Sequence, residues 1–303
     1  MTTKRETAEG VRPPSAEELL VVVGPTASGK SELAMALCER FDGELVGADS
    51  VQIYRHFDIG SGKPSREDRS RVTHHLVDAV DPIDPLDASR YVASADRAIA
   101  EIRRRGRVPV VCGGTFLWVK ALLHGLAPSA PRDEAVRAEH EAFVAAHGRP
   151  ALHARLAEVD PDSAARLAPN DFVRVSRSLE VYEVTGRTQT AWHDEHRFAE
   201  VRHRARLLGV ERPRDELDDR IHRRTARWLE EGWLEEVADL LDRGYRDTRA
   251  MESVGYRQVR DHLDGSLSRS DLATAIVRAT RTFVRRQRTW LRDQPVTWLS
   301  SAP

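Results

Sequence analysis

The chain has 303 residues, 40% of them hydrophobic, and its 47 lysines and arginines nearly balance its 48 acidic residues. This composition predicts a globular protein with a sizeable core and excludes whole-molecule attraction to a polyanion, so a nucleic-acid contact would need a local basic patch. Cys38 and Cys112 lie far apart in apolar surroundings, which indicates reduced, buried thiols. Because neither a secretory leader nor an apolar run of about 18 residues is found, we expect a cytoplasmic protein without membrane segments.

Residues 1–16 are polar and contain two adjacent prolines, a pattern that predicts a disordered tail. The apolar, β-branched run at 19–23 then predicts a buried strand. It leads into GPTASGKS at 24–31, which matches the P-loop pattern G-x-x-x-x-G-K-[ST] at the junction of a strand and a helix. We expect the whole loop to bind a phosphate group through Gly24, Pro25, Thr26, Ala27, Ser28, Gly29, Lys30 and Ser31.

The residue types of this loop suit phosphate chemistry. Glycine lets successive backbone N–H groups turn towards one anion, and the N-terminus of the following helix is electropositive. Lys30 supplies a positive charge to the terminal phosphate, and the Ser31 hydroxyl can ligate Mg²⁺. Loops of this kind bind nucleotides such as ATP, but the motif alone does not identify the phosphate compound.

Two further strand ends carry side chains of interest. Apolar residues at helical spacing predict a helix that stops at 41–43, and 44–48 predicts a second strand, parallel to the first. Asp49 follows that strand, at the sheet edge where ligands of α/β proteins bind. Its carboxylate could hold Mg²⁺, act as a general base, bind a ribose hydroxyl or cap a turn. The strand at 107–112 ends in Gly-Gly-Thr instead of an acidic residue, which argues against ordinary ATP hydrolysis.

The remaining elements are predominantly helical. Residues 72–84 predict a short strand and turns, and 205–210 predicts a strand that returns to the sheet. Helices are predicted at 89–105, 117–123, 171–184, 214–229, 234–242, 255–263 and 272–292. The proline-punctuated stretch 128–170 predicts a small all-helical insertion domain. We therefore expect an α/β fold, a P-loop NTPase-like parallel sheet flanked by helices, whose core spans 17–127 and 171–300.

The last predicted helix has a face of arginines. Five of them recur at spacings of three and four, namely Arg278, Arg281, Arg285, Arg288 and Arg292, and no acidic residue falls between the first and the last. Charges without local partners could meet phosphates of a nucleic-acid backbone or of a small diphosphate. The alternative is that these arginines form an ordinary solvent-exposed helix face without a ligand.

Several motifs together resemble the tRNA dimethylallyltransferases, the bacterial enzymes that prenylate the adenine just 3′ of the anticodon. Besides the P-loop, the resemblance rests on DSVQIYRHFDIGSGKP at 49–64, GGTFLWVKALLHGL at 113–126, NDFVRVSRSLEVYEVTGR at 170–187 and SVGYRQ at 253–258. The order and spacing of these motifs run over nearly the whole chain after the tail. The segment 49–64 is far more specific than the P-loop.

The resemblance implies transfer of a dimethylallyl group from dimethylallyl diphosphate to the exocyclic amine of an adenine in tRNA. Lys30, Ser31 and Mg²⁺ would neutralise the diphosphate leaving group, and Asp49 would be the general base. Thr115 matches a position that meets the substrate adenosine. The helical insertion would clamp the anticodon stem. No membrane and no obligate protein partner is implied, and we expect a monomer.

The same resemblance assigns the tRNA contacts. They are Asp49, Ser50, Val51, Gln52, Thr115, Arg137, Arg174, Ser176, Arg177, Gly255, Tyr256 and Arg257. The target base must leave the stack of the anticodon loop to reach a pocket at the strand ends. Two alternatives stay open, a prenyltransferase of free nucleotides and a P-loop kinase of small molecules. The motif at 253–258 and the arginine-bearing C-terminal half favour tRNA as the substrate.

Overall fold

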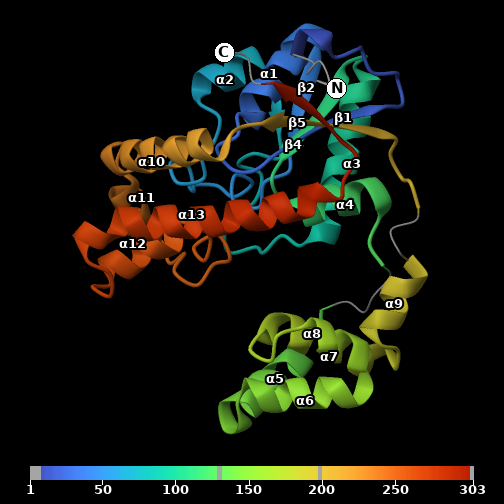
Figure 1. Ribbon diagram of the computed structural model, residues 1–303, viewed down its shortest axis with the longest axis vertical. Coiled ribbons are helices and arrows are strands. Elements are labelled where there is room, and N and C mark those ends of the chain that lie inside the picture. The colour runs from blue at the N-terminus through green and yellow to red at the C-terminus, as the bar shows by residue number, and fades with distance from the viewer. Residues whose placement is uncertain (1–7, 128–131, 197–199, 301–303) are drawn as a thin grey trace. The chain divides into compact units, whose positions relative to one another are not determined.

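The computed structural model of the protein describes residues 8–127, 132–196 and 200–300. Six strands form one parallel sheet in the order β3-β2-β4-β1-β5-β6 (Figure 1). The strands are β1 (Leu19–Val23), β2 (Gly43–Gly47), β3 (His74–His75), β4 (Val108–Gly113), β5 (Ala205–Glu211) and β6 (Val296–Ser300). The chain divides into an α/β unit, residues 1–123 and 202–303, and a helical unit, residues 124–201.

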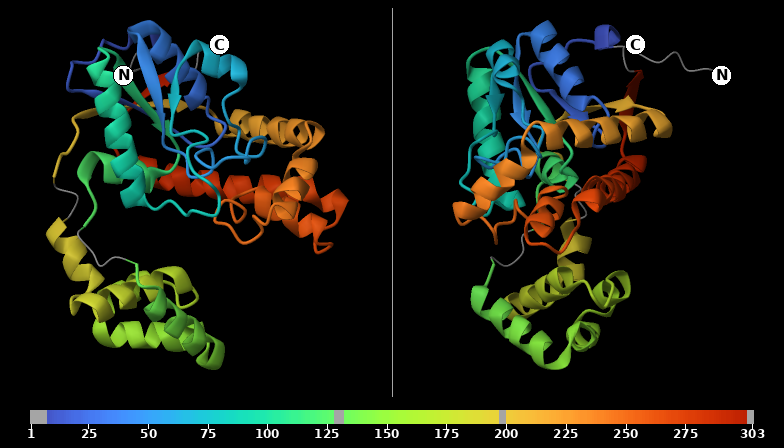
Figure 2. Two further views of the ribbon diagram at one scale, coloured as in Figure 1. Left: turned by 180° about the vertical axis from the view of Figure 1, so that it is seen from behind. Right: turned by 90° about the vertical axis from the view of Figure 1, so that its left-hand side faces the viewer.

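Helices cover both faces of the sheet in the α/β unit (Figure 2). They are α1 (Lys30–Phe41), α2 (Arg66–Arg71), α3 (Ala88–Arg104), α4 (Phe116–His124), α10 (Arg214–Glu230), α11 (Trp233–Asp242), α12 (Tyr256–Leu263) and α13 (Arg269–Arg292). Alternate residues of β1 enter two separate cores. Leu20 and Val22 pack with α1, whereas Val21 and Val23 pack in the larger core with α3, α4 and the C-terminal helices.

Strand register brings three loops to one edge of the sheet. Val23 at the end of β1 pairs with Gly113 of β4, and Gly47 of β2 pairs with Cys112. The segments that follow these strands therefore emerge side by side, as expected for the ligand-binding edge of a parallel sheet. The approach is close, because a Cβ built on Gly113 would lie 2.0 Å from the carbonyl oxygen of Ala48.

The helical unit has a small core of its own. Its helices are α5 (Glu134–His147), α6 (Arg149–Val159), α7 (Pro161–Arg166), α8 (Phe172–Thr185) and α9 (Gln189–His196). Leu179 of α8 packs with Leu152 and Leu156 of α6. The predicted boundary at residue 170 is therefore corrected: α8 belongs to the helical unit because it completes that core.

The α/β fold with a parallel sheet is confirmed, and Cys38 and Cys112 are free and buried. Two predictions need correction. The last strand, β6, pairs with β5 although the sequence suggested no strand there. Of the predicted disordered tail, residues 1–7 lie outside the described part of the chain, but Val11 is 1% exposed and joins the core of α1, so the tail is ordered from this point. None of the described helices is long and apolar enough to cross a membrane.

The close approach of β2 and β4 predicts the effect of Gly113→Ala. The added methyl group would meet backbone atoms, which cannot rotate away, so we expect the free energy of unfolding in urea to fall by at least about 3 kcal/mol. Gly106→Ala is the matched control, because that position has φ 75° and open space around a Cβ. Its cost should be only about 1 to 2 kcal/mol. Equal losses for the two variants would contradict the prediction.

Candidate active site

The P-loop, which joins β1 to α1, is held from outside by two arginines. Nε of Arg212 donates to the carbonyl oxygen of Ser28 at 2.6 Å, and Nε of Arg220 donates to that of Ala27 at 2.9 Å. Because C=O and N–H of a trans peptide point in opposite directions, the following N–H groups turn to the inside of the loop. Gly29 caps α1 without a side-chain hydrogen bond, which leaves the amides of the first helical turn available to an anion.

A cavity of about 950 Å³ opens beside the P-loop within the α/β unit. Its lining residues with charged or hydrogen-bonding side chains include Lys30, Ser31, Asp49, Gln52, Arg220, Arg223, Arg224 and Arg227. Acidic side chains line the cavity too, namely Glu32, Glu39, Asp58, Asp68 and Glu231 besides Asp49, so the arginines of one wall and Lys30 are a local concentration of positive charge. Over the described part of the chain, the ammonium group of Lys30 has no hydrogen bond and no ion pair, so it is available to a ligand.

Arg224 gives the clearest sign of what the cavity accepts. Its guanidinium lies 4.4 Å from the ring centroid of Trp228, and its Nε is buried without a hydrogen-bond partner in the described residues. Burial, together with the positive charge of Arg227, lowers the pKa of Arg224 to about 10. Asp49 and Glu32 offset only part of this effect, and the half-buried Arg224 forms no ion pair among the described residues, so this wall of the cavity fits an anion.

Asp49 stands opposite these cations, half-buried at the end of β2. Its Oδ1 accepts hydrogen bonds from the N–H groups of Val51 at 2.9 Å and Gln52 at 3.2 Å. Oδ2 has no hydrogen-bond partner among the residues that the structure describes, so it can accept a proton. Thr115 lies beside it, since its Oγ1 accepts a hydrogen bond from the N–H of Ser50 at 3.0 Å. The three predicted residues Asp49, Ser50 and Thr115 are thus brought together.

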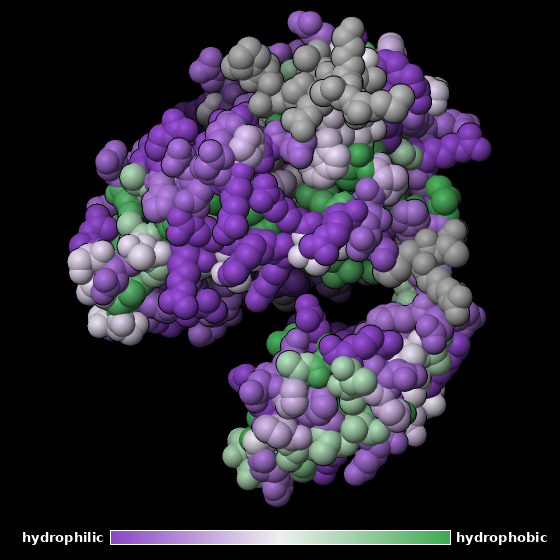
Figure 3. All heavy atoms as spheres, in the orientation of Figure 1, coloured by the Kyte–Doolittle hydropathy of each residue, from purple (hydrophilic) through white to green (hydrophobic). Residues whose placement is uncertain are grey.

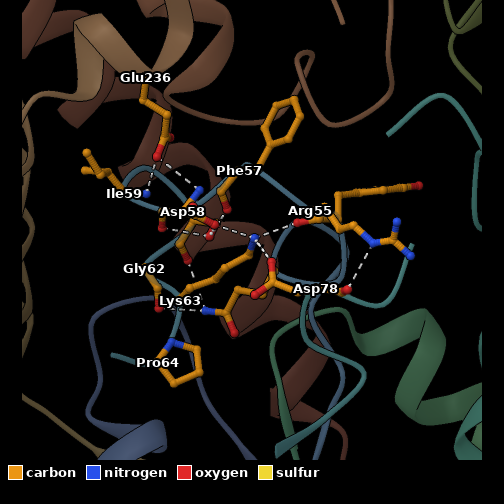
Figure 4. A network of polar contacts seen from close by, with 12 residues as sticks. Arg55, Phe57, Asp58, Ile59, Gly62, Lys63, Pro64, Asp78 and Glu236 are labelled. Carbon is orange, nitrogen blue, oxygen red and sulfur yellow. Dashed lines mark hydrogen bonds and ion pairs between the residues drawn. The ribbon is translucent and has the colours of Figure 1, made fainter. Parts of the chain in front are cut away.

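Buried polar contacts hold the rest of the 49–64 segment in place (Figure 4). Nζ of Lys63 donates to the carbonyl oxygen of Tyr54 at 2.6 Å and forms ion pairs with Asp58 at 2.6 Å and with Asp78. The side chain of Lys63 is only 3% exposed. This lysine therefore fixes the shape of the loop that borders the cavity.

Glu236 of α11 supports the same loop from the other side. Its carboxylate accepts hydrogen bonds from the N–H groups of Asp58 at 3.1 Å and Ile59 at 2.7 Å, and from the hydroxyl of Tyr256 at 2.6 Å. Burial raises the pKa of Glu236 despite these hydrogen bonds. The side chain of Tyr256, a predicted tRNA contact, is 0% exposed and points to Glu236, and the contact of this position with tRNA stays a prediction.

A single indole supports both this loop and the turn before α12. A Cβ on Gly60 would lie 2.1 Å from the Trp233 ring, and a Cβ on Gly255 would lie 2.2 Å from it. Gly255 also has φ 95°, a conformation that glycine adopts readily. Both positions therefore require glycine. The neighbouring Arg257 is exposed and stays a predicted tRNA contact.

In the helical unit, two of the predicted tRNA contacts share a buried carboxylate. Arg137 donates twice to Glu180 at 2.9 Å, Arg177 donates to it at 2.7 Å, and the N–H of Asp133 adds a bond of 2.7 Å. Burial alone would raise the pKa of Glu180, but these donors outweigh burial and hold that pKa at about 2. Glu180 thus holds both guanidinium groups in fixed positions on the helical unit.

The other two predicted contacts of this unit differ in exposure. Ser176 is 4% exposed, and its Oγ lies 2.9 Å from Nδ1 of His140, so its side chain is engaged inside the unit while its contact with tRNA stays a prediction. Arg174 is exposed and pairs with Asp171 at 3.1 Å. It stays a predicted contact.

The arginine face of α13 is partly occupied by interactions within the protein. Arg281 pairs with Asp218 of α10, and Arg288 donates to the carbonyl oxygen of Arg212 at 3.2 Å, which corrects the expectation that these charges lack partners. The remaining three are exposed and have no acidic partner in the described part of the chain, namely Arg278, Arg285 and Arg292. Figure 3 shows hydrophilic residues over this helix.

Comparison with known proteins identifies the family. The IPP transferase model matches residues 52–294, and the isopentenyl transferase model matches residues 17–79. A tRNA dimethylallyltransferase of Sorangium cellulosum (strain So ce56) is 67% identical over 292 residues, which cover 96% of this chain and 93% of that relative. The chain belongs to the IPP transferase family. Another relative, the tRNA dimethylallyltransferase of Myxococcus xanthus (strain DK1622), is 47% identical over 91% of this chain and 90% of its own length.

Solved structures of this family share the fold. The crystal structure of a full-length tRNA isopentenylpyrophosphate transferase from Bacillus halodurans is 37% identical, with a TM-score of 0.69 over 94% of this chain and 90% of that one. A eukaryotic dimethylallyltransferase acting on tRNA is 25% identical, with a TM-score of 0.74 over 91% of this chain and 70% of that one. The P-loop-like architecture of the IPP transferase family is thus present here.

The four arginines of α10 that line the cavity of this IPP transferase were not predicted as site residues from the sequence. The spacing of three and four along α10 places these arginines on one helical face, and this signal was available in the sequence. They are Arg220, Arg223, Arg224 and Arg227.

For a metal, no described group of three His, Cys, Asp or Glu side chains is arranged as a site. The exposed hydroxyl of Ser31 at the cavity fits a Mg²⁺ ion whose other ligands would be phosphate oxygens and water.

The Glu180 cluster predicts a pH-dependent stability of the helical unit. Because its folded pKa of about 2 is below the ordinary value of 4.5, the stabilisation is present above about pH 4.5 and is lost as the pH falls towards 2. Glu180→Gln should remove this dependence and cost about 3 kcal/mol at neutral pH, because it removes the buried carboxylate with which Arg137 and Arg177 both pair. Hydrogen exchange of residues 132–196, followed by mass spectrometry, measures it.

Glu158→Gln is the matched control, since Glu158 is exposed on α6 of the same unit. Its exchange rates should equal those of the parent chain. If Glu180→Gln also left the exchange rates unchanged at neutral pH, the structural role of the Glu180 cluster would be refuted.

Proposed function

We propose that this IPP transferase moves a dimethylallyl group from dimethylallyl diphosphate to the exocyclic amine of the adenine 3′ of the anticodon in tRNA. The observation that carries the proposal is one cavity lined by an anion-binding loop, by four arginines of α10 and by the carboxylate of Asp49. Relatives named tRNA dimethylallyltransferase over nearly the full chain support the reaction and its substrates. The reaction takes place in the cytoplasm, where tRNA is found.

The cations of the cavity serve the leaving group. In the reaction the bond between carbon C1 and oxygen breaks, and the electron pair stays with the diphosphate. Lys30, Arg224 and the amides at the start of α1 stabilise the negative charge that grows on it. Bound Mg²⁺, held by the Ser31 hydroxyl and diphosphate oxygens, would add charge neutralisation.

Asp49 and Thr115 serve the adenine. The amine nitrogen attacks C1 and forms the new carbon–nitrogen bond, and its proton passes to Oδ2 of Asp49. Oδ1 is engaged by the amides of Val51 and Gln52, which keeps the carboxylate oriented. Thr115 is tied to the same segment through Ser50, which supports a contact between its hydroxyl and the flipped-out base.

The alternatives explain fewer features. A prenyltransferase of free nucleotides has no use for the paired arginines of the helical unit or for the exposed arginines of α13. A small-molecule kinase would use the P-loop, but β4 ends in Gly-Gly-Thr, without a carboxylate for the metal ion of a triphosphate. Incubation with labelled dimethylallyl diphosphate and either tRNA or AMP, followed by mass spectrometry of the nucleosides, separates these functions. Phosphorylation of a small molecule without tRNA prenylation would refute the proposal.

Asp49→Asn tests the general base. The amide oxygen can still accept the hydrogen bonds of Val51 and Gln52, so the loop should keep its shape while the proton acceptor is removed. We expect the single-turnover rate to fall about 10² to 10⁴-fold. The affinity for tRNA, measured by filter binding, should stay within about twofold. A weaker affinity with an unchanged rate would contradict the assignment.

The three exposed arginines of α13 predict a salt-dependent contribution to tRNA binding. Replacing Arg278, Arg285 and Arg292 together by glutamine should reduce the slope of log affinity against log salt by about 0.7 to 0.9 for each tRNA phosphate that these arginines neutralise. Arg281→Gln is the control on the same helix, because its guanidinium is already paired with Asp218. An unchanged slope in the triple variant would show that this face is only solvated.

A further inference from the structure

Gln287 is a buried side chain in the middle of the arginine-rich helix α13. It is 3% exposed, although exposed arginines flank it on both sides. Its Oε1 accepts a hydrogen bond from the N–H of Thr26 in the P-loop at 2.8 Å. Its Nε2 donates to the carbonyl oxygen of Gly114, just after β4, at 3.1 Å. One primary amide thus joins the loops that follow two different strands.

These two loops have no sheet hydrogen bonds with which to hold each other. The pairing of β1 with β4 ends at Val23 and Gly113. Beyond this point the amide of Gln287 acts as a peptide group would, with an acceptor for one loop and a donor for the other. The fit is close, because a Cβ on Gly114 would lie 2.5 Å from Nε2 of Gln287.

The connection continues to the proposed base. Gly114 precedes Thr115, whose N–H donates to the carbonyl oxygen of Ala48 at 3.2 Å and whose Oγ1 accepts from the N–H of Ser50 at 3.0 Å. Asp49 lies between these two residues. A continuous series of hydrogen bonds therefore runs from the P-loop through Gln287 and Thr115 to the backbone on both sides of Asp49.

We propose that Gln287 is a positioning residue that sets the distance between the diphosphate cradle and the adenine pocket. The inference rests on the proposed function, in which C1 of a diphosphate ester must meet an amine beside Asp49. A displacement of about 1 Å between reacting groups can cost about 10²-fold in rate. The P-loop and the base segment belong to different strands, and Gln287 keeps their separation fixed.

Two substitutions of Gln287 test its two hydrogen bonds separately. Gln287→Met fills similar space and removes both bonds, so we expect kcat to fall about 10 to 100-fold and the Kd for dimethylallyl diphosphate to rise. Gln287→Glu keeps an acceptor for the N–H of Thr26 but sets a carboxylate oxygen against the carbonyl of Gly114. Its kcat at pH 8 should fall as far as that of the methionine variant. At pH 5, where its carboxyl group is largely protonated, its Kd for dimethylallyl diphosphate should stay within about threefold of the parent value, whereas at pH 8 the negative charge beside the P-loop should raise this Kd.

The pH dependence of Gln287→Glu gives a readout that loss of stability would not produce. Burial and the facing carbonyl raise the pKa of the new carboxyl group above its ordinary value of about 4.3. The protonated form can donate to Gly114, so activity should return as the pH falls. The ratio of variant to parent kcat should therefore increase from pH 8 to pH 5, because the ratio removes the pH dependence that the two proteins share.

Thr289→Glu is the control, because it adds the same charge to the exposed side of α13, two residues away. Its kcat ratio should stay flat over this pH range. A flat ratio for Gln287→Glu, or parent values of kcat and Kd for Gln287→Met, would overturn the role of Gln287. A parent chain that does not prenylate tRNA would instead refute the proposed function, while the changes in diphosphate affinity would still test the bridge to Thr26.

Discussion

The pairing of β4 with both β1 and β2 is the constraint on which the site depends. It places three strand ends at one edge, so the P-loop and Asp49 come from distant parts of the sequence and still line one cavity, while Thr115 is held beside Asp49 through Ser50. The hydrogen bonds between the strands end before the loops that carry the site residues. Beyond the strands, side chains hold these loops in place. Arg212 and Arg220 hold carbonyl groups of the P-loop, and Glu236 holds the amides of the loop after β2. The site is thus a set of loops that are held in place by residues of the C-terminal part of the chain.

Local patterns were sufficient for much of this arrangement. The apolar run before the P-loop, the helical spacing after it and the strand that precedes Asp49 each predict a single element, and together they predict a parallel sheet. The sequence predicts the end of the helical insertion too early, at residue 170. The reason is that α8 is amphipathic, and its pattern of apolar residues is compatible with packing in either unit. Its packing on Leu152 and Leu156 shows that α8 belongs to the helical unit. The strand β6 is five residues long and depends on β5 for its hydrogen bonds, which no local pattern reveals.

Within the site, motif residues were easier to find than the residues that support them. Ser176 and Tyr256 belong to motifs of the family, yet the structure turns both side chains inward, so membership of a motif did not distinguish contact from support. Gln287 carried no signal at all, because a glutamine among arginines reads as one more polar surface residue. Burial of a polar side chain is a tertiary property, and it identified this residue only once the fold was known.

The buried guanidinium of Arg224 has a consequence for the end of the catalytic cycle. A cavity that places Lys30 and Arg224 beside a loop of amides interacts with the diphosphate group itself and hardly with the carbon skeleton attached to it. Once the prenyl group has left, inorganic diphosphate carries at least as much negative charge as the ester did. We therefore expect the cavity to retain its by-product and diphosphate to compete with the next substrate molecule, so that clearing of the cavity limits turnover.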